Sequence, residues 1–145
     1  MWLVGALALA LLWRRAQVFL LVVVADAASD LAASGLKALI PRDRPTLRYP
    51  EPRALVHVPG THSFPSGHAA TSFACAAALT WFAPQLAGPL LVLAAAIAFS
   101  RVYVGVHYPL DVAGGAALGA AIGVATALLL RGAARPRSTR ELRGG

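Results

Sequence analysis

The stretch Ser100–Asp111 reads Ser-Arg-Val-Tyr-Val-Gly-Val-His-Tyr-Pro-Leu-Asp and separates two long apolar segments. It contains Arg101, His107 and Asp111, three ionisable residues that lipid-facing segments normally exclude. Such residues at membrane depth need a polar partner or a watery cavity. We therefore interpret this stretch as the centre of a functional site, for which the apolar segments provide the frame.

His107 and Asp111 are four residues apart, so a helix that begins near Tyr108 brings their side chains to one face of its first turn. A carboxylate that accepts from one imidazole nitrogen fixes the tautomer and leaves the other nitrogen free to act as a nucleophile. Pro109 is compatible with a first helical turn. By itself the pair leaves an alternative open, in which Asp111 only caps a helix and His107 is an interfacial histidine.

Two further polar stretches lie at the ends of apolar segments. One extends from Lys37 through six residues to Arg44-Pro45, and the other is Pro65-Ser66-Gly67-His68. Together with Ser100–Asp111, these stretches resemble the three signature motifs of the type-2 phosphatidic acid phosphatase family, which also includes vanadium haloperoxidases and glucose-6-phosphatase. Every signature position is filled in the expected order, and the resemblance covers about half of the chain.

The resemblance implies a six-helix bundle and a covalent phosphohistidine, with no metal and no other cofactor. It assigns catalysis to His107 as nucleophile, Asp111 as its orienting partner, and His68 as general acid and then base. It assigns phosphate binding to five residues: Lys37, Arg44, Ser66, Gly67 through its backbone N–H, and Arg101. The implied activity is that of an integral membrane lipid phosphatase that hydrolyses a phosphomonoester or diphosphate headgroup.

The substrate that the resemblance implies is a phosphorylated membrane lipid, such as phosphatidic acid, phosphatidylglycerol phosphate or undecaprenyl diphosphate. The sequence does not choose among them, because generic Ala, Leu and Val form the helix faces. Two alternatives stay open: a vanadate-dependent haloperoxidase-like enzyme, and a catalytically silent lipid-binding or transport protein.

The composition places the chain in a bilayer. It has 145 residues, enough for one domain, and 58% of them are hydrophobic while only 13% are charged. The net charge of +7 lies in loops and a tail, with no basic face that carries interleaved aromatic residues, so we expect no nucleic-acid partner. A single cysteine, Cys75, cannot form a disulfide framework or a cysteine-based zinc site.

We expect an all-α integral membrane bundle with about four full spans and one partial N-terminal span. The full spans are expected at residues 16–40, 66–83, 86–103 and 109–130, and residues 1–13 reach only about 18 Å of the roughly 30 Å hydrocarbon core. Residues 1–131 would form the membrane-embedded phosphatase domain, with an irregular active-site loop at 41–63. Residues 132–145 would be a basic, disordered cytoplasmic tail.

The short N-terminal segment departs from the resemblance, which implies six spanning helices. We therefore expect the first helix to be missing and the second shortened. Either upstream sequence or a partner, such as a second copy in a homodimer, would then cover the exposed apolar faces.

Residues 16–40 carry a polar stripe formed by Asp26, Asp30, Ser34 and Lys37. A lone Asp at the membrane centre costs about 2.5–3.5 kcal/mol, so the stripe must face the bundle or a watery cavity. We interpret it as a structural seam between helices in preference to a proton relay.

The last expected span has Gly115, Gly119 and Gly123 at four-residue spacing, which predicts a close helix–helix contact. Two loop histidines, His57 and His62, lack a third ligand nearby, so we interpret them as ordinary loop residues.

The parity of the spans places Arg14-Arg15 and the arginine-rich tail on one side and all three motifs on the other. The positive-inside rule then predicts a multi-pass protein of the cell inner membrane whose active site faces the periplasm or exterior. Arg42, Arg48 and Arg53 in the loop either attract anionic headgroups or form a solvated rim.

Overall fold

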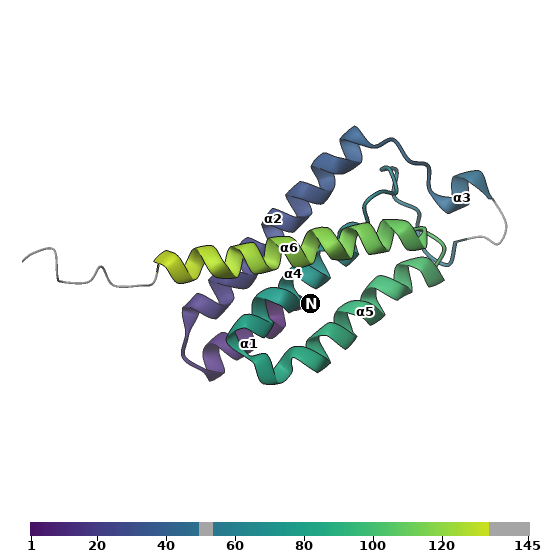
Figure 1. Cartoon of the computed structure of the whole chain (residues 1–145). Helices are drawn as coiled ribbons and strands as arrows, with labels where there is room; N and C mark the ends of the chain where they lie inside the picture. Colours follow the sequence, from purple (N-terminus) through teal and green to yellow (C-terminus); the bar gives the residue numbers. More distant parts are fainter. Residues whose placement is uncertain (50–53, 134–145) are drawn as a thin grey trace, which may run out of the picture.

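The structure is a computed structural model that describes residues 1–49 and 54–133. Within these residues every regular element is helical, which confirms the expected all-α fold (Figure 1). In chain order the elements are α1 (Trp2–Leu12), α2 (Ala16–Leu39), α3 (Pro45–Arg48), α4 (Gly67–Phe82), the 3-10 helix η1 (Pro84–Leu86), α5 (Ala87–Tyr103) and α6 (Pro109–Ala133).

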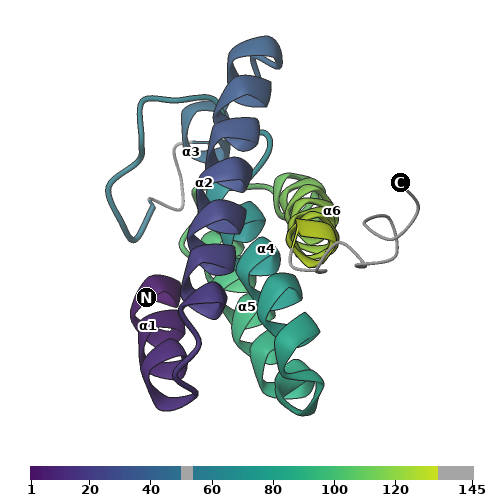
Figure 2. The same ribbon diagram turned by 90° about the vertical axis from the view of Figure 1, so that its left-hand side faces the viewer.

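Helix α4 is the centre of the bundle and packs against α1, α2, α5 and α6. Figures 1 and 2 show the other long helices arranged around it. Most of the buried side chains of α4 are small, including Ala70, Ala74 and Ala78, so neighbouring helices approach its backbone closely. An alanine-rich central helix therefore sets the spacing of the whole bundle.

Among the described residues, three segments are long and apolar enough to span a membrane: Ala16–Leu39, Pro84–Tyr103 and Pro109–Leu130. The fourth expected span corresponds to α4, whose 16 residues fall just below the range of about 17–25 residues for a spanning helix. The expected count of four full spans is therefore approximate. The partial N-terminal span is α1, with 11 residues.

Helix α1 packs on α2 and α4 through Ala6 and Ala10, which are buried in a cluster with Val18, Val22 and other apolar residues. The indole N–H of Trp2 donates to Ser72 Oγ over 3.1 Å and ties the start of α1 to α4. The short helix is thus an integral part of the apolar core.

Two boundaries differ from expectation. The active-site loop at 41–63 contains one helical turn, α3, because Pro45 occupies its first position, where no backbone N–H is needed. Helix α6 continues to Ala133, so residues 132 and 133, expected to begin the tail, belong to the helix. Residues 134–145 of the predicted disordered tail lie outside the described residues.

The glycines of α6 form the predicted close contact, and their partner is α4. A Cβ added at Gly119 would collide with the carbonyl oxygen of Ala70, and one added at Gly123 would collide with that of Ala74. No side chain larger than hydrogen fits between the two backbones. This contact holds the first turns of α4 and α6 together, and these turns carry two of the three motifs.

We predict that Gly119→Ala lowers the stability of the bundle by about 1–3 kcal/mol, because the added methyl group forces α6 away from α4. Thermal unfolding in a mild detergent measures this effect as a lower Tm. The matched control is Gly35→Ala in α2, where an added Cβ meets nothing within 4 Å. This control should leave Tm unchanged or raise it, since alanine favours a helix. Equal Tm values for the two variants would contradict the packing argument.

Candidate active site

The three motifs meet at one end of the bundle, where α2 ends, α4 begins, and α5 is followed by α6. A cavity of about 490 Å³ opens there. The motif residues on its wall are Lys37, Arg44, Gly67, His68 and His107, and it also extends to Asp26, Asp30 and Thr71. Segments far apart in the sequence therefore bring two histidines and two cationic side chains to one cavity.

His107 lies in the tight connection between α5 and α6. Gly105 has a φ of +80°, a left-handed conformation that favours glycine, and it turns the chain back toward the bundle. The backbone N–H of His107 then donates to the Arg101 carbonyl over 3.3 Å. Only 6% of His107 is exposed, so the turn delivers its imidazole into the protein at the wall of the cavity.

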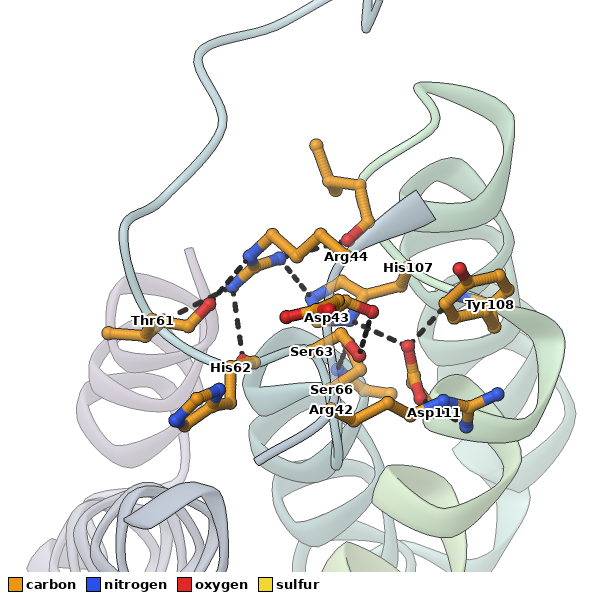
Figure 3. A network of polar contacts seen from close by, with 12 residues as sticks. Arg42, Asp43, Arg44, Thr61, His62, Ser63, Ser66, His107, Tyr108 and Asp111 are labelled. Atoms are coloured by element: carbon orange, nitrogen blue, oxygen red, sulfur yellow. Dashed lines mark hydrogen bonds and ion pairs between the residues drawn. The ribbon is translucent and has the colours of Figure 1, made fainter. Parts of the chain in front are cut away.

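The two ring nitrogens of His107 have different neighbours (Figure 3). Nε2 lies 3.3 Å from Nη1 of Arg44, and Nδ1 lies 3.5 Å from Oδ2 of Asp111. A guanidinium only donates, so Nε2 must be the acceptor and carry the lone pair. The proton of the neutral ring is then on Nδ1, toward the carboxylate, as a nucleophilic Nε2 requires.

The site favours the neutral form of His107. Burial, reinforced by the positive charge of Arg44, lowers the pKa of His107 to about 4, although the Asp111 carboxylate acts in the opposite direction. A pKa below the ordinary value means that the imidazole loses its proton well below neutral pH. Near pH 7 the imidazole is therefore neutral in nearly every molecule, and its Nε2 lone pair accepts from Arg44 Nη1.

Arg44 is held rigidly from several directions (Figure 3). Its Nε donates to the Thr61 carbonyl over 2.9 Å, Nη2 donates to Thr61 Oγ1 over 3.1 Å, and Nη1 donates to the Val106 carbonyl over 2.9 Å. Burial lowers the pKa of the guanidinium, but arginine is so strongly basic that this group stays protonated at neutral pH. Arg44 is thus a fixed cation beside Nε2 of His107.

Asp111 is fully buried, and its two oxygens have separate partners. Oδ1 accepts from Arg42 Nη1 over 2.8 Å, and Oδ2 accepts from the Tyr108 backbone N–H over 2.9 Å. The guanidinium of Arg42 also lies over the Tyr108 ring, 4.5 Å from its centre. These contacts fix the carboxylate that faces His107 Nδ1. Asp111 therefore caps α6, and its Oδ2 faces His107 Nδ1.

Arg42 is one of the three loop arginines that the sequence left undecided, as either attractors of anionic headgroups or part of a solvated rim. Its partner Asp111 lies 69 positions away in the sequence. Nothing local to residues 41–63 signals this ion pair. The one available hint was that a buried carboxylate requires a cation or several donors.

The remaining motif residues surround the cavity in different ways. The Lys37 Nζ lies 3.2 Å from the place that a Cβ would take at Gly67, so the amine lies against the first turn of α4. Ser66 caps this helix: its Oγ accepts from the Ala69 N–H over 3.5 Å and is buried behind the cavity wall. Arg101 also lies off the wall, and its Nε donates to Ser100 Oγ over 3.0 Å.

A metal centre was not expected. Within residues 1–49 and 54–133, no group of three or more His, Cys, Asp or Glu side chains gathers around one point. Of the two loop histidines, His62 contributes its backbone carbonyl, which accepts from Arg44 Nη2 over 3.4 Å. The positive charge at the cavity comes from lysine and arginine.

Comparisons with known proteins show which proteins this chain is similar to. The family model of the PAP2 superfamily matches residues 17–135. A decaprenylphosphoryl-5-phosphoribose phosphatase of Mycobacterium tuberculosis is 41% identical over 121 residues, and the match covers 83% of this chain and 64% of the relative. The undecaprenyl-diphosphatase BcrC of Bacillus subtilis is 34% identical over 98 residues, 62% of this chain and 51% of the relative.

A solved structure has a similar fold. The crystal structure of a transmembrane PAP2 type phosphatidylglycerolphosphate phosphatase from Bacillus subtilis matches with a TM-score of 0.67 and 28% identity. The match covers 93% of this chain and 70% of that one. The chain therefore spans roughly half to two thirds of the curated relatives above and somewhat more of the solved structure.

The ion pair of Arg42 with Asp111 predicts a specific defect when it is removed. Arg42→Ala frees the carboxylate to rotate away from His107, so kcat for phosphate release from a lipid phosphate should fall about tenfold or more while KM changes little. The matched control is Arg48→Ala, an exposed arginine of the same loop. Equal effects of both variants, or a change confined to KM, would show that Arg42 only attracts the anionic substrate.

Proposed function

The chain belongs to the PAP2 superfamily, and we propose on this basis that it is a membrane phosphatase that removes phosphate from a lipid headgroup through a phosphohistidine. The observation that carries the proposal is the pairing of His107 Nε2 with a fixed cation. The Nε2 atom lies 3.3 Å from Arg44 Nη1, at the wall of a cavity that Lys37 and His68 also line.

Substrate binding is the first step of the proposal. A headgroup phosphate enters the cavity and its oxygens accept hydrogen bonds from Lys37, from the Gly67 N–H at the start of α4 and from Arg44. For this, the Nη1 donor of Arg44 that contacts His107 Nε2 passes to a phosphate oxygen, which frees the Nε2 lone pair. The positive end of this helix adds to the attraction. Ser66 would support the site by holding the first turn of α4. Arg101 donates to Ser100 through Nε alone, so its two terminal nitrogens can donate to the phosphate from the side of α5.

Phosphoryl transfer to the enzyme follows. His107 Nε2 attacks phosphorus in line, the bond between phosphorus and the lipid oxygen breaks, and a proton from His68 passes to the leaving oxygen. As His107 becomes a cationic phosphoimidazole, Asp111 stabilises the proton on Nδ1. The fixed cations stabilise the charge that develops on the phosphoryl oxygens.

Hydrolysis of the intermediate regenerates the enzyme. His68, now neutral, takes a proton from a water molecule as this water attacks phosphorus, and the bond between phosphorus and Nε2 breaks. Inorganic phosphate leaves, and His68 is again protonated for the next cycle. No step in this sequence requires a metal ion, since lysine and arginine supply the charge.

The substrates that relatives are named for support a lipid phosphate as the substrate class. They include a decaprenyl-linked phosphoribose, undecaprenyl diphosphate and phosphatidylglycerol phosphate. In each, a phosphate near the headgroup belongs to a lipid with a long apolar part. The cavity lies where spanning helices end, at the depth at which such a phosphate is found.

The proposed location is the cell inner membrane, with the cavity open to the periplasm or exterior. Arg14-Arg15 and the end of α6 lie at the end of the bundle opposite the motifs, which supports a cytoplasmic position for that end. A homodimer remains a prediction. It is motivated by exposed apolar side chains on α1 and α5, such as Leu12, Val92 and Phe99.

A phosphate-release assay tests the proposal. Purified protein in detergent should release inorganic phosphate from at least one of phosphatidic acid, phosphatidylglycerol phosphate, a prenylphosphoryl phosphoribose or a prenyl diphosphate, with excess chelator present. His107→Ala should lower the rate about a thousandfold or more, because it removes the nucleophile. His57→Ala, an exposed loop histidine, is the matched control.

Two results would contradict the proposal. One is the absence of phosphate release by folded wild-type protein on all four lipids. The other is a rate that chelation abolishes and added magnesium or zinc restores, which would assign the chemistry to a metal.

A further inference from the structure

The cavity is longer than a phosphate group needs. Beyond Lys37 it follows α2 toward the middle of that helix and reaches Asp30 and Asp26. Seven residues of α-helix separate Lys37 from Asp30 and correspond to a rise of about 10 Å, and Asp26 lies about 6 Å further. The wall therefore changes from cationic to anionic along the direction in which a lipid headgroup would extend.

The two carboxylates have unused acceptor capacity. Asp26 Oδ1 accepts a weak contact from the Cys75 thiol over 3.6 Å. In the part of the chain that the structure describes, Oδ2 of Asp26 and both oxygens of Asp30 accept no hydrogen bond, and neither residue forms an ion pair. A seam between helices would pair these groups, so the interpretation of the stripe as a structural seam accounts only for the contact of Asp26 with Cys75.

The opposite wall contributes a hydroxyl. Thr71 lies one turn after His68 on α4 and lines the same cavity. Its Oγ1 donates to the His68 carbonyl over 3.5 Å. This hydrogen bond is long, so a ligand oxygen that comes closer would replace it. One side of the cavity thus carries carboxylate acceptors and the other a group that both donates and accepts.

The phosphate is expected at the end of the cavity that is opposite to Asp26 and lies beside the start of α4. His107, 94% buried, and Arg44, 98% buried, both line it together with the amine of Lys37, so this end of the cavity carries two cations. These groups indicate an anionic ligand at that end independently of the carboxylates. With phosphate there, the unit next to it in the substrate lies along α2 beside Asp30.

The chemistry of that next unit follows from the charges. A second phosphate beside Asp30 would place like charges together in the same cavity, which is unfavourable. A neutral unit that carries hydroxyl groups would donate to the free carboxylate oxygens in charge-assisted hydrogen bonds. The wall is suited to a glycerol or sugar unit and unsuited to a diphosphate.

Building on the proposed phosphatase function, we infer that Asp26, Asp30 and Thr71 form a subsite for the hydroxyl groups of a polyol headgroup. The protein would then prefer a phosphomonoester on a glycerol or sugar unit with free hydroxyl groups to a phosphomonoester without them and to a lipid diphosphate. Asp30 contributes the larger part, since it is nearer to Lys37 and both of its oxygens are available.

The test compares three lipid probes of matched chain length in the same detergent. A prenylphosphoryl phosphoribose carries free hydroxyls beside the phosphomonoester, phosphatidic acid carries a phosphomonoester without them, and a prenyl diphosphate carries a second phosphate. For the wild-type protein, kcat/KM should be about tenfold or more higher for the first probe than for the other two.

The Asp30→Asn variant keeps the size of the side chain and removes its charge. It should lower kcat/KM for the hydroxyl-bearing probe about tenfold and raise it for the diphosphate, so that the ratio of the two falls by more than tenfold. Asp26→Asn should shift the ratio in the same direction by a smaller factor. The matched control is Asp43→Asn, an exposed acid of the active-site loop that lies off the cavity wall, for which the ratio should stay constant.

Three results would overturn the inference, and they are distinguishable. A wild-type preference for the diphosphate would refute the subsite while leaving the phosphatase function in place. An equal loss on all three probes in Asp30→Asn would assign the carboxylate to catalysis or charge balance. Phosphate release from none of the probes would remove the proposed function itself, and the subsite with it.

Discussion

The site depends on one buried carboxylate, that of Asp111. Its oxygens accept from Arg42 and from the Tyr108 N–H, its backbone carbonyl accepts from the Ser66 N–H over 2.9 Å, and Oδ2 faces His107. A single residue thus joins the loop after α2, the start of α4 and the start of α6. A buried charge is costly unless it is fully paired, so these segments must be in place together. Order at the site is therefore coupled to assembly of the bundle.

The glycine face of α6 supplies the geometry that this carboxylate needs. Gly119 and Gly123 let the backbone of α6 contact that of α4 at Ala70 and Ala74. The same contact, one turn earlier at Gly115, lies against the Ser66 carbonyl, directly beside the second motif. Close packing in the middle of the bundle and the polar contacts at its end are thus two parts of one interface. A substitution in either part is expected to be felt in the other.

Much of this arrangement could be predicted from the sequence, and the reasons differ from residue to residue. The helix start at Pro109, the cap at Ser66 and the proximity of His107 to Asp111 follow from local spacing and helix geometry, which act over a few residues. The glycine spacing likewise predicts a close contact, although not that α4 is the partner. The phosphohistidine mechanism came from resemblance to a family and remains a proposal.

Other features could not be predicted because they depend on distant partners. The pairing of Arg42 with Asp111 spans 69 positions, and the same local sequence is compatible with a solvated arginine. The burial of Ser66 and the contact of Arg101 with Ser100 depend on how α4, α5 and α6 pack. Asp26 and Asp30 were visible as a polar stripe, but only the packed bundle shows that they share a cavity with Lys37.

The central claim is that Nε2 of His107 becomes bonded to phosphorus during turnover. The most direct measurement is to quench the enzyme during steady-state hydrolysis of a lipid labelled in its terminal phosphate, digest it under alkaline conditions, and locate the label by mass spectrometry. The account predicts an acid-labile, alkali-stable phosphoryl group on the peptide that contains His107, in wild-type protein and not in His107→Ala. A phosphoryl group on His68, or phosphate release with no labelled peptide under conditions that trap phosphohistidine, would contradict it.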